Sequence, residues 1–224
     1  MIRIIYKGQD KDILKHKVLK AFNDTSKVFK DNLANVTVYI FPSRKEFNHY
    51  IGEETETWII ANASPNNEIA ILSPVALKRD SIHSSREFLP VLKHEFAHLF
   101  VNKLANGKTV PKWLDEGLAQ YVAKQYKDAE YAVKKAENDF CKKLATKSDW
   151  NKRVDRQAYQ VAALFVNYLI NKYSFQKVKE LLTLLDKEYY YTSFKKEFFK
   201  VYKISLSEVE REFVKGINSH NKNK

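Results

Sequence analysis

Hydrophobic residues recur with two different periods along this chain. Over residues 10–31 they return every three to four positions, which predicts an amphipathic helix. Short β-branched and aromatic runs instead predict four strands, at residues 2–6, 36–41, 57–63 and 68–72. A short helix is expected at 43–50, because Ser43 and Glu46 have the spacing of a capping box.

From residue 85 to the end, the pattern is helical. The expected helices cover residues 85–105, 112–126, 129–146, 155–173, 175–186, 192–202 and 206–217. This order predicts an α+β fold in which a small mixed N-terminal sheet precedes a mainly helical half. We expect a single domain over 1–217, divided into an α/β part (1–83) and a helical part (84–217), followed by a disordered tail at 218–224.

The composition excludes several classes of protein. Hydrophobic residues make up 44% of the 224 positions, which is too many for a disordered chain. The single cysteine, Cys141, excludes a disulfide-stapled scaffold and a cysteine-based zinc finger, and we expect it to be a buried, inert thiol. No apolar run approaches the roughly 18 residues of a membrane span.

The chain is basic, with 39 Lys and Arg against 27 Asp and Glu and a net charge of +12. Such an excess can attract nucleic acid or an acidic partner. The lysines are spread out and no arginine cluster occurs, so we expect solvated helix faces and consider nucleic acid an unfavoured partner. The first seven residues do not resemble a signal peptide, which favours a cytoplasmic location; secretion stays open if a leader was removed.

The segment His94-Glu95-Phe96-Ala97-His98 carries the clearest chemistry. Residues four apart stack on one face of a helix, so His94 and His98 can offer two imidazole nitrogens to one metal ion. Glu95 lies next to the first ligand and can take a proton from a metal-activated water. Apolar flanks such as Leu92 and Phe100 make a buried helical host credible.

A third ligand has to come from elsewhere in the chain, because catalytic zinc normally has three protein ligands. A third histidine at the metzincin spacing is absent, which leaves carboxylates. The segment 111–121 supplies two of them, Asp115 and Glu116. Gly117 costs this helix about 1 kcal/mol relative to alanine, and a close approach to the His94 helix would explain it.

An HExxH helix followed by a W-L-x-E-G-x-A helix resembles the gluzincin metallopeptidases, most closely the peptidase MA-like families and more distantly the M1 aminopeptidases. The matching residues are His94, Glu95, His98, Trp113, Leu114, Glu116, Gly117, Ala119 and Tyr121. The resemblance implies a zincin-like fold, one Zn²⁺ per chain, Glu116 as the third ligand, and hydrolysis of peptide or protein substrates with Glu95 as general base. It also suggests Tyr159 as the residue that stabilises the oxyanion.

Two other readings stay open beside the zinc peptidase. One is a catalytically inactive, peptidase-like binding or regulatory module, and the other is a basic nucleic-acid-binding protein. The presence of all four expected residues, His94, Glu95, His98 and Glu116, favours the peptidase. The substrate, the choice between endopeptidase and aminopeptidase, and the oligomeric state stay open. An edge strand at 57–63 or 68–72 is a candidate for pairing with an extended peptide.

Overall fold

The computed structural model describes residues 1–6, 11–125, 133, 136–153 and 157–220. The chain divides into two compact units, Met1–Phe100 and Val101–Lys224, and each is described by itself. The first unit contains a four-stranded sheet and the second is helical in the part described, which confirms the expected α+β class. The expected single catalytic domain over 1–217 stays a prediction.

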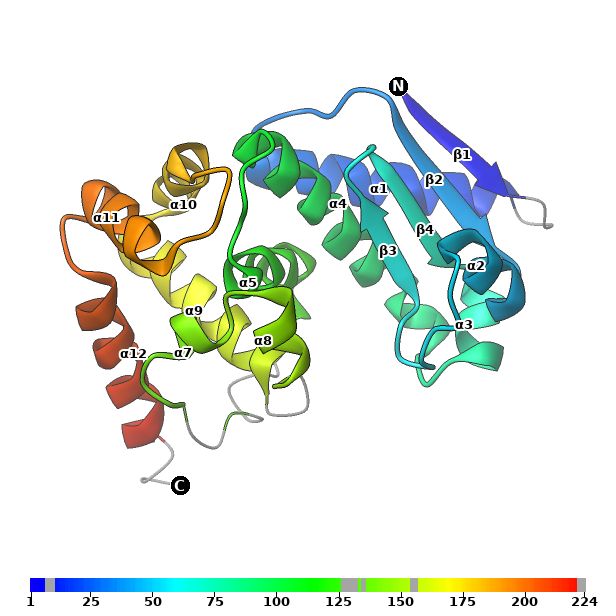
Figure 1. The fold of residues 1–224 in the computed structure, drawn as a ribbon. Coiled ribbons are helices and arrows are strands. Elements are labelled where there is room, and N and C mark those ends of the chain that lie inside the picture. The colour runs from blue at the N-terminus through cyan, green and yellow to red at the C-terminus, as the bar shows by residue number, and fades with distance from the viewer. Residues whose placement is uncertain (7–10, 126–132, 134–135, 154–156, 221–224) are drawn as a thin grey trace. The chain divides into compact units, whose positions relative to one another are not determined.

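The sheet of the first unit is mixed (Figure 1). Its strands are β1 (Ile2–Tyr6), β2 (Val36–Phe41), β3 (Ala61–Ser64) and β4 (Glu68–Leu72), in the order β1-β2-β4-β3. The pairs β1·β2 and β2·β4 are parallel, whereas β3 pairs with β4 in an antiparallel hairpin. The strand at 68–72 therefore lies inside the sheet, and only β3 of the two candidate peptide-pairing strands is an edge strand.

The two faces of β2 differ in burial. Val36, Val38 and Ile40 are buried, as expected for alternate residues that face a core. On the opposite face, Tyr39 and Phe41 contact α2 (Arg44–Ile51), where the rings of Tyr39 and Tyr50 lie 4.8 Å apart. The helices α1 (Lys11–Phe29) and α2 lie on different faces of the sheet (Figure 1).

The third strand is shorter than expected, beginning at Ala61 rather than at residue 57. The reason is Arg44, whose guanidinium donates hydrogen bonds to the carbonyl groups of Glu56, Thr57 and Ile59. These carbonyls are therefore used by a side chain instead of a neighbouring strand. The structure also contains a helix that the pattern missed, α3 (Pro74–Asp80), which starts at the N-cap Ser73.

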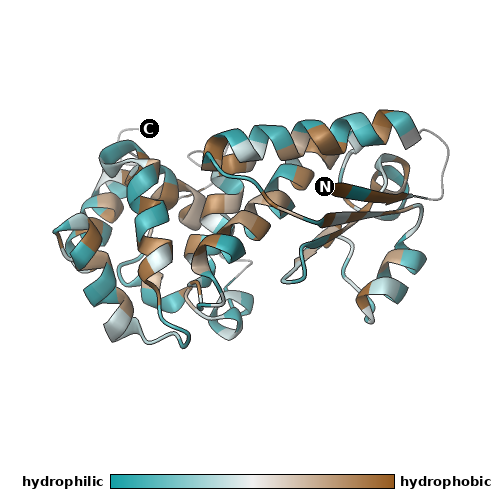
Figure 2. Cartoon of the chain, turned by 90° about the horizontal axis from the view of Figure 1, so that it is seen from above, coloured by the Kyte–Doolittle hydropathy of each residue, from teal (hydrophilic) through white to brown (hydrophobic). Residues whose placement is uncertain are grey.

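The second unit is built from helices that carry hydrophobic and hydrophilic residues side by side (Figure 2). They are α5 (Lys112–Ala123), α7 (Phe140–Lys143), α8 (Lys147–Asn151), α9 (Ala158–Tyr173), α10 (Phe175–Leu184), α11 (Tyr191–Tyr202) and α12 (Leu206–His220). The helix expected to end at 217 thus continues to His220, and the rest of the expected tail, 221–224, lies outside the described residues.

The expected long helix at 129–146 is wrong where it can be compared. Residues 126–132, 134 and 135 lie outside the described residues, and of the remainder only Phe140–Lys143 is helical, as the short helix α7. Asp139 has a left-handed backbone with φ 61°, which interrupts a helix directly before α7. Thr146 then caps the N-terminus of α8 by accepting a hydrogen bond from the Asp149 amide.

Gly117 allows close packing of α5 against α9, whereas the expected approach of this glycine to the His94 helix stays a prediction. A Cβ atom at this position would lie 2.5 Å from Cγ2 of Val166 and 2.6 Å from the carbonyl oxygen of Ala162. The second of these neighbours is backbone and cannot turn away. The glycine therefore sets how closely the two helices approach each other.

Substitution of Gly117 by alanine should destabilise the protein, because the added methyl group forces α5 away from α9. We expect Gly117→Ala to lower the free energy of unfolding by about 3 kcal/mol in urea denaturation. Gly216→Ala is the matched control, since Gly216 is also helical and has nothing within 4 Å of its Cβ position. This control should gain about 0.5–1 kcal/mol. Equal stability of the two variants would contradict the proposed close approach.

Candidate metal centre

The helix α4 (Phe88–Ala105) carries the HExxH segment and is firmly held within the first unit. Its Phe96 and Phe100 are fully buried, and their rings contact Phe22 of α1 at 5.4 and 6.3 Å between centroids. Lys93 forms an ion pair with Asp24 of α1 at 2.7 Å, and the hydrogen bond from Lys93 lowers the pKa of that carboxyl. Apolar ring contacts and an ion pair therefore both stabilise the packing of α4 against α1.

His94 and His98 lie on the same side of α4, as the spacing of four residues predicts. Their ring centroids are 4.8 Å apart and the ring planes are inclined by 74°. Both histidines are half-buried, whereas Glu95 is only 8% exposed. Ser84 precedes this helical segment, and its amide donates a hydrogen bond to the carboxylate of Glu87 at 2.7 Å, as in a capping box.

The helix α5 is fixed at its start by the backbone of a distant segment. The amide of Lys112 donates to the carbonyl of Ala145 at 2.7 Å, and that of Trp113 donates to Leu144 at 3.1 Å. These bonds satisfy two amides that a helix N-terminus otherwise leaves without a helical partner. Trp113 is fully buried, and its ring lies 5.3 Å from that of Phe165. The W-L-x-E-G segment thus has a packing role in addition to carrying Glu116.

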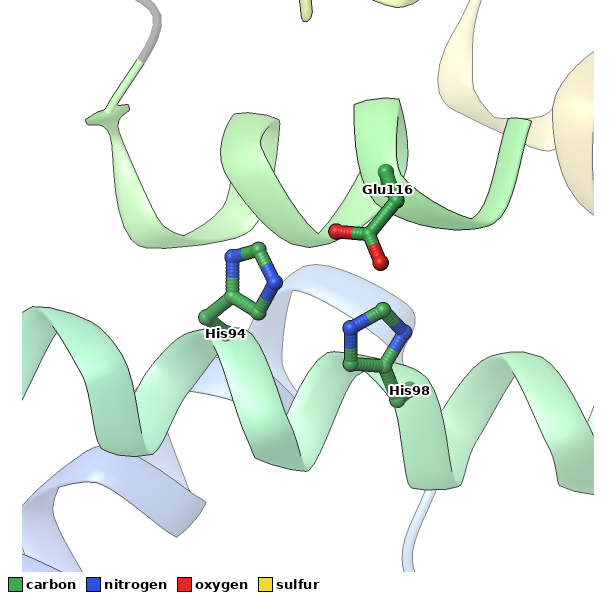
Figure 3. A group of neighbouring side chains, drawn as sticks. All are labelled: His94, His98 and Glu116. Atoms are coloured by element: carbon green, nitrogen blue, oxygen red, sulfur yellow. The ribbon is translucent and has the colours of Figure 1, made fainter. Parts of the chain in front are cut away.

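His94, His98 and Glu116 form a group in which each residue offers one ligand atom and all three atoms lie within 4.8 Å of one another. Figure 3 shows the two imidazole rings on one side of α4 and the carboxylate of Glu116 directed toward them. The ligand atoms of a tetrahedral zinc ion lie roughly 3.4 Å apart, so a group of this size could hold such an ion. Two imidazoles and one carboxylate are a donor set that fits a metal ion of this kind.

The family model described as the Peptidase MA superfamily matches residues 16–217 of this sequence. The chain belongs to the peptidase MA superfamily. No curated protein matches the sequence. The match begins within α1 and ends within α12, and it includes the whole of the His94, His98 and Glu116 group. As a member of this superfamily, the chain has a peptidase-like fold with a side-chain group that could hold a metal ion. None of the helices in the described part is long and apolar enough to cross a bilayer.

Glu116 also takes part in an ion pair that the sequence analysis missed. The ammonium of Lys112 lies 2.6 Å from Oε1 of Glu116 and 3.8 Å from Oδ2 of Asp115. Burial by itself would lower the pKa of Lys112, but the carboxylates of Glu116 and Asp115 outweigh burial and raise it above the ordinary value. The spacing of four residues between Lys112 and Glu116 is the signal that could have revealed this pair.

Tyr159, expected near the site from the gluzincin resemblance, lies in the first turn of α9. Its ring packs against that of Trp150 at 4.9 Å and nearly at right angles. Tyr159 is also among the groups that raise the pKa of Lys112, after the larger effects of Glu116 and Asp115.

Cys141 is fully buried in α7, in agreement with the expected inert thiol. Burial raises the pKa of its thiol well above the usual value, and the neighbouring carboxylate of Glu210 raises it further. The Cys141 amide donates a hydrogen bond to that carboxylate at 2.8 Å. The thiolate, which is the nucleophilic form, is therefore disfavoured at neutral pH.

Cys141 should resist thiol reagents as long as the protein is folded. We expect an aromatic disulfide reagent at pH 8 to modify the native chain at least about 100-fold more slowly than the chain unfolded in urea. Because Cys141 is the single cysteine, the released chromophore reports on this residue alone. Equal rates in both states would mean that the thiol is accessible and ionised.

Proposed function

We propose that this chain is a zinc-dependent peptidase of gluzincin type that hydrolyses peptide bonds. The observation that carries the proposal is the group of His94, His98 and Glu116, whose ligand atoms lie within 4.8 Å of one another in a chain of the peptidase MA superfamily. In this proposal the two histidines and Glu116 hold Zn²⁺. When bound, zinc would lower the pKa of a water molecule to about 7 and polarise the scissile carbonyl.

Glu95 is the proposed general base. It follows the first proposed ligand on α4, and its side chain is almost entirely shielded from bulk water. In peptide hydrolysis it takes a proton from the attacking water and then delivers that proton to the leaving amine. One carboxylate can perform both transfers, since the proton accepted in the first is the proton needed in the second.

Tyr159 is the proposed hydrogen-bond donor to the tetrahedral oxyanion. Its support is its place at the start of α9, close to the Lys112 and Glu116 pair. A phenol fixed by packing against Trp150 loses little freedom when it donates such a bond.

Peptide or protein chains are the proposed substrates. The edge strand β3 is available to pair with an extended backbone, a recognition mode that reads main-chain groups rather than particular side chains. The segment 57–64 has no acidic residue that could hold a free amino terminus. This absence favours cleavage within a chain over removal of its first residue.

Metal content tests the proposed ligand set directly. Elemental mass spectrometry should find about one zinc per parent chain, and Glu116→Ala should lose most of it. Glu95→Gln should keep its zinc but cleave a peptide library at least about 100-fold more slowly, because the general base is gone. Asp115→Asn is the matched control, since it removes the adjacent carboxylate without touching a proposed ligand.

Two outcomes would contradict the proposal. A parent chain that holds no zinc after zinc has been supplied and the excess removed would leave a metal-free binding module, or a nucleic-acid binder if its affinity for nucleic acid falls steeply with salt. Zinc retained by Glu116→Ala but lost from Asp115→Asn would move the third ligand to Asp115. Undiminished cleavage by Glu95→Gln would remove the general base from the mechanism.

The role of Tyr159 can be tested separately from metal binding. Tyr159→Phe removes the hydroxyl but keeps the ring that packs on Trp150, so zinc content and stability should match those of the parent. We expect kcat to fall about 100-fold while KM changes little, since the lost bond forms only in the transition state. Tyr168→Phe, in the same helix, is the control and should be fully active. A fully active Tyr159→Phe would exclude this residue as the donor.

A further inference from the structure

The position of the Lys112 ammonium is unfavourable for the stability of α5 in two respects. Lys112 is the first residue of α5, where the helix dipole disfavours positive charge. It also precedes its carboxylate partner by four residues, which is the weaker of the two orders for such a pair. The stability of α5 alone therefore does not explain why a lysine is found at this position.

The pair with Glu116 differs from the exposed ion pairs of the same unit. The side chain of Glu116 is 6% exposed and that of Lys112 is 31% exposed, with 2.6 Å between Nζ and Oε1. Lys177 and Glu180 of α10 are 41% and 44% exposed, with 3.0 Å between the charged atoms. A shielded, charge-assisted hydrogen bond restrains a carboxylate, whereas an exposed pair is loosened by water and salt.

Lys112 is itself well anchored, because its amide donates to the carbonyl of Ala145. The backbone that carries the ammonium is therefore fixed by a contact outside α5. The ammonium holds one oxygen of Glu116, and a carboxylate with one oxygen held in this way presents the other in a defined direction. The whole arrangement, including Glu116, lies within the helical unit.

We propose that Lys112 is a positioning residue, which holds one oxygen of the Glu116 carboxylate so that the other is presented to the metal. This inference rests on the proposed function, in which Glu116 is a zinc ligand. Groups that bind the outer atoms of metal ligands orient them, and their loss typically weakens metal binding 10–100-fold. An ammonium also repels a divalent cation, so the direction of the change in zinc affinity distinguishes positioning from competition.

The zinc dissociation constants of purified parent and variant chains, measured by competition with a chromogenic chelator, test this role. Lys112→Met keeps an unbranched apolar stem and removes the charge, and it should weaken zinc binding about 10–100-fold. Lys112→Arg keeps a cationic donor and should stay within about threefold of the parent. Lys177→Met, which breaks an exposed pair with a glutamate that is not a proposed ligand, should bind zinc as the parent does.

Urea unfolding of the metal-free variants separates positioning from a purely structural role. A structural role would lower the free energy of unfolding in Lys112→Met but leave the zinc affinity of the folded chain unchanged, and that result would overturn the inference. Tighter zinc binding by Lys112→Met would also overturn it, since the ammonium would then compete with the metal. If Lys112→Met does not fold, Lys112→Gln replaces it with a neutral side chain and should show the same weakening.

Glu116→Ala in the same series distinguishes this inference from the proposed function. If Glu116→Ala loses zinc affinity while Lys112→Met keeps it, the ligand set stands and the positioning role fails. If Glu116→Ala binds zinc as tightly as the parent, or if the parent binds none, the proposed function fails and the inference fails with it. Weakening in both variants, with affinity kept in Lys112→Arg, is the expected result.

Discussion

Close packing between α5 and α9 is the constraint on which the position of Glu116 depends. Gly117 permits it, because any side chain at this residue would overlap Val166 and the backbone of Ala162. The adjacent Trp113 is buried against Phe165 of the same helix α9. Glu116, the proposed third ligand, therefore lies in α5 between the large, buried Trp113 and the small Gly117. Both residues pack against α9 and limit how far α5 can shift.

Burying Glu116 creates an electrostatic requirement that the surrounding residues have to meet. A carboxylate removed from water needs a cation or several hydrogen bonds. The ammonium of Lys112 supplies such a cation, and a metal ion held with His94 and His98 would supply a second. These requirements are the physical basis for expecting a metal at this group.

Membership of the peptidase MA superfamily indicates the fold of the chain, whereas the group of His94, His98 and Glu116 indicates which chemistry is possible. The superfamily shows which fold the chain has, and its members can be inactive. The residues decide whether the chemistry is possible, and here the metal-ligating types and the carboxylate beside them are all present. The buried, protonated thiol of Cys141 offers no competing nucleophile. These side chains are the reason for proposing peptide hydrolysis by a metal-activated water.

The sequence by itself determined those features that depend on neighbours within one or two helical turns. The α+β order, most helix starts and the shared face of His94 and His98 follow from periodicity, capping side chains and helix pitch. The antiparallel hairpin of β3 and β4 was predictable for the same reason, since a short turn joins its strands.

Only the tertiary structure decided the features that join distant residues. Arg44 binds the carbonyl groups of Glu56, Thr57 and Ile59, so that β3 begins later than expected, and Gly117 contacts α9. Both contacts join segments that lie far apart in the sequence, and hydrophobic periodicity does not relate such segments to each other. Asp139 has a left-handed backbone directly before α7, within the segment 129–146 that was expected to be one helix. The hydrophobic pattern does not indicate this conformation. Two carboxylates, Asp115 and Glu116, were equal candidates by composition and spacing. In the structure Glu116 is buried and belongs to the group with His94 and His98, and its burial depends on how α5 packs.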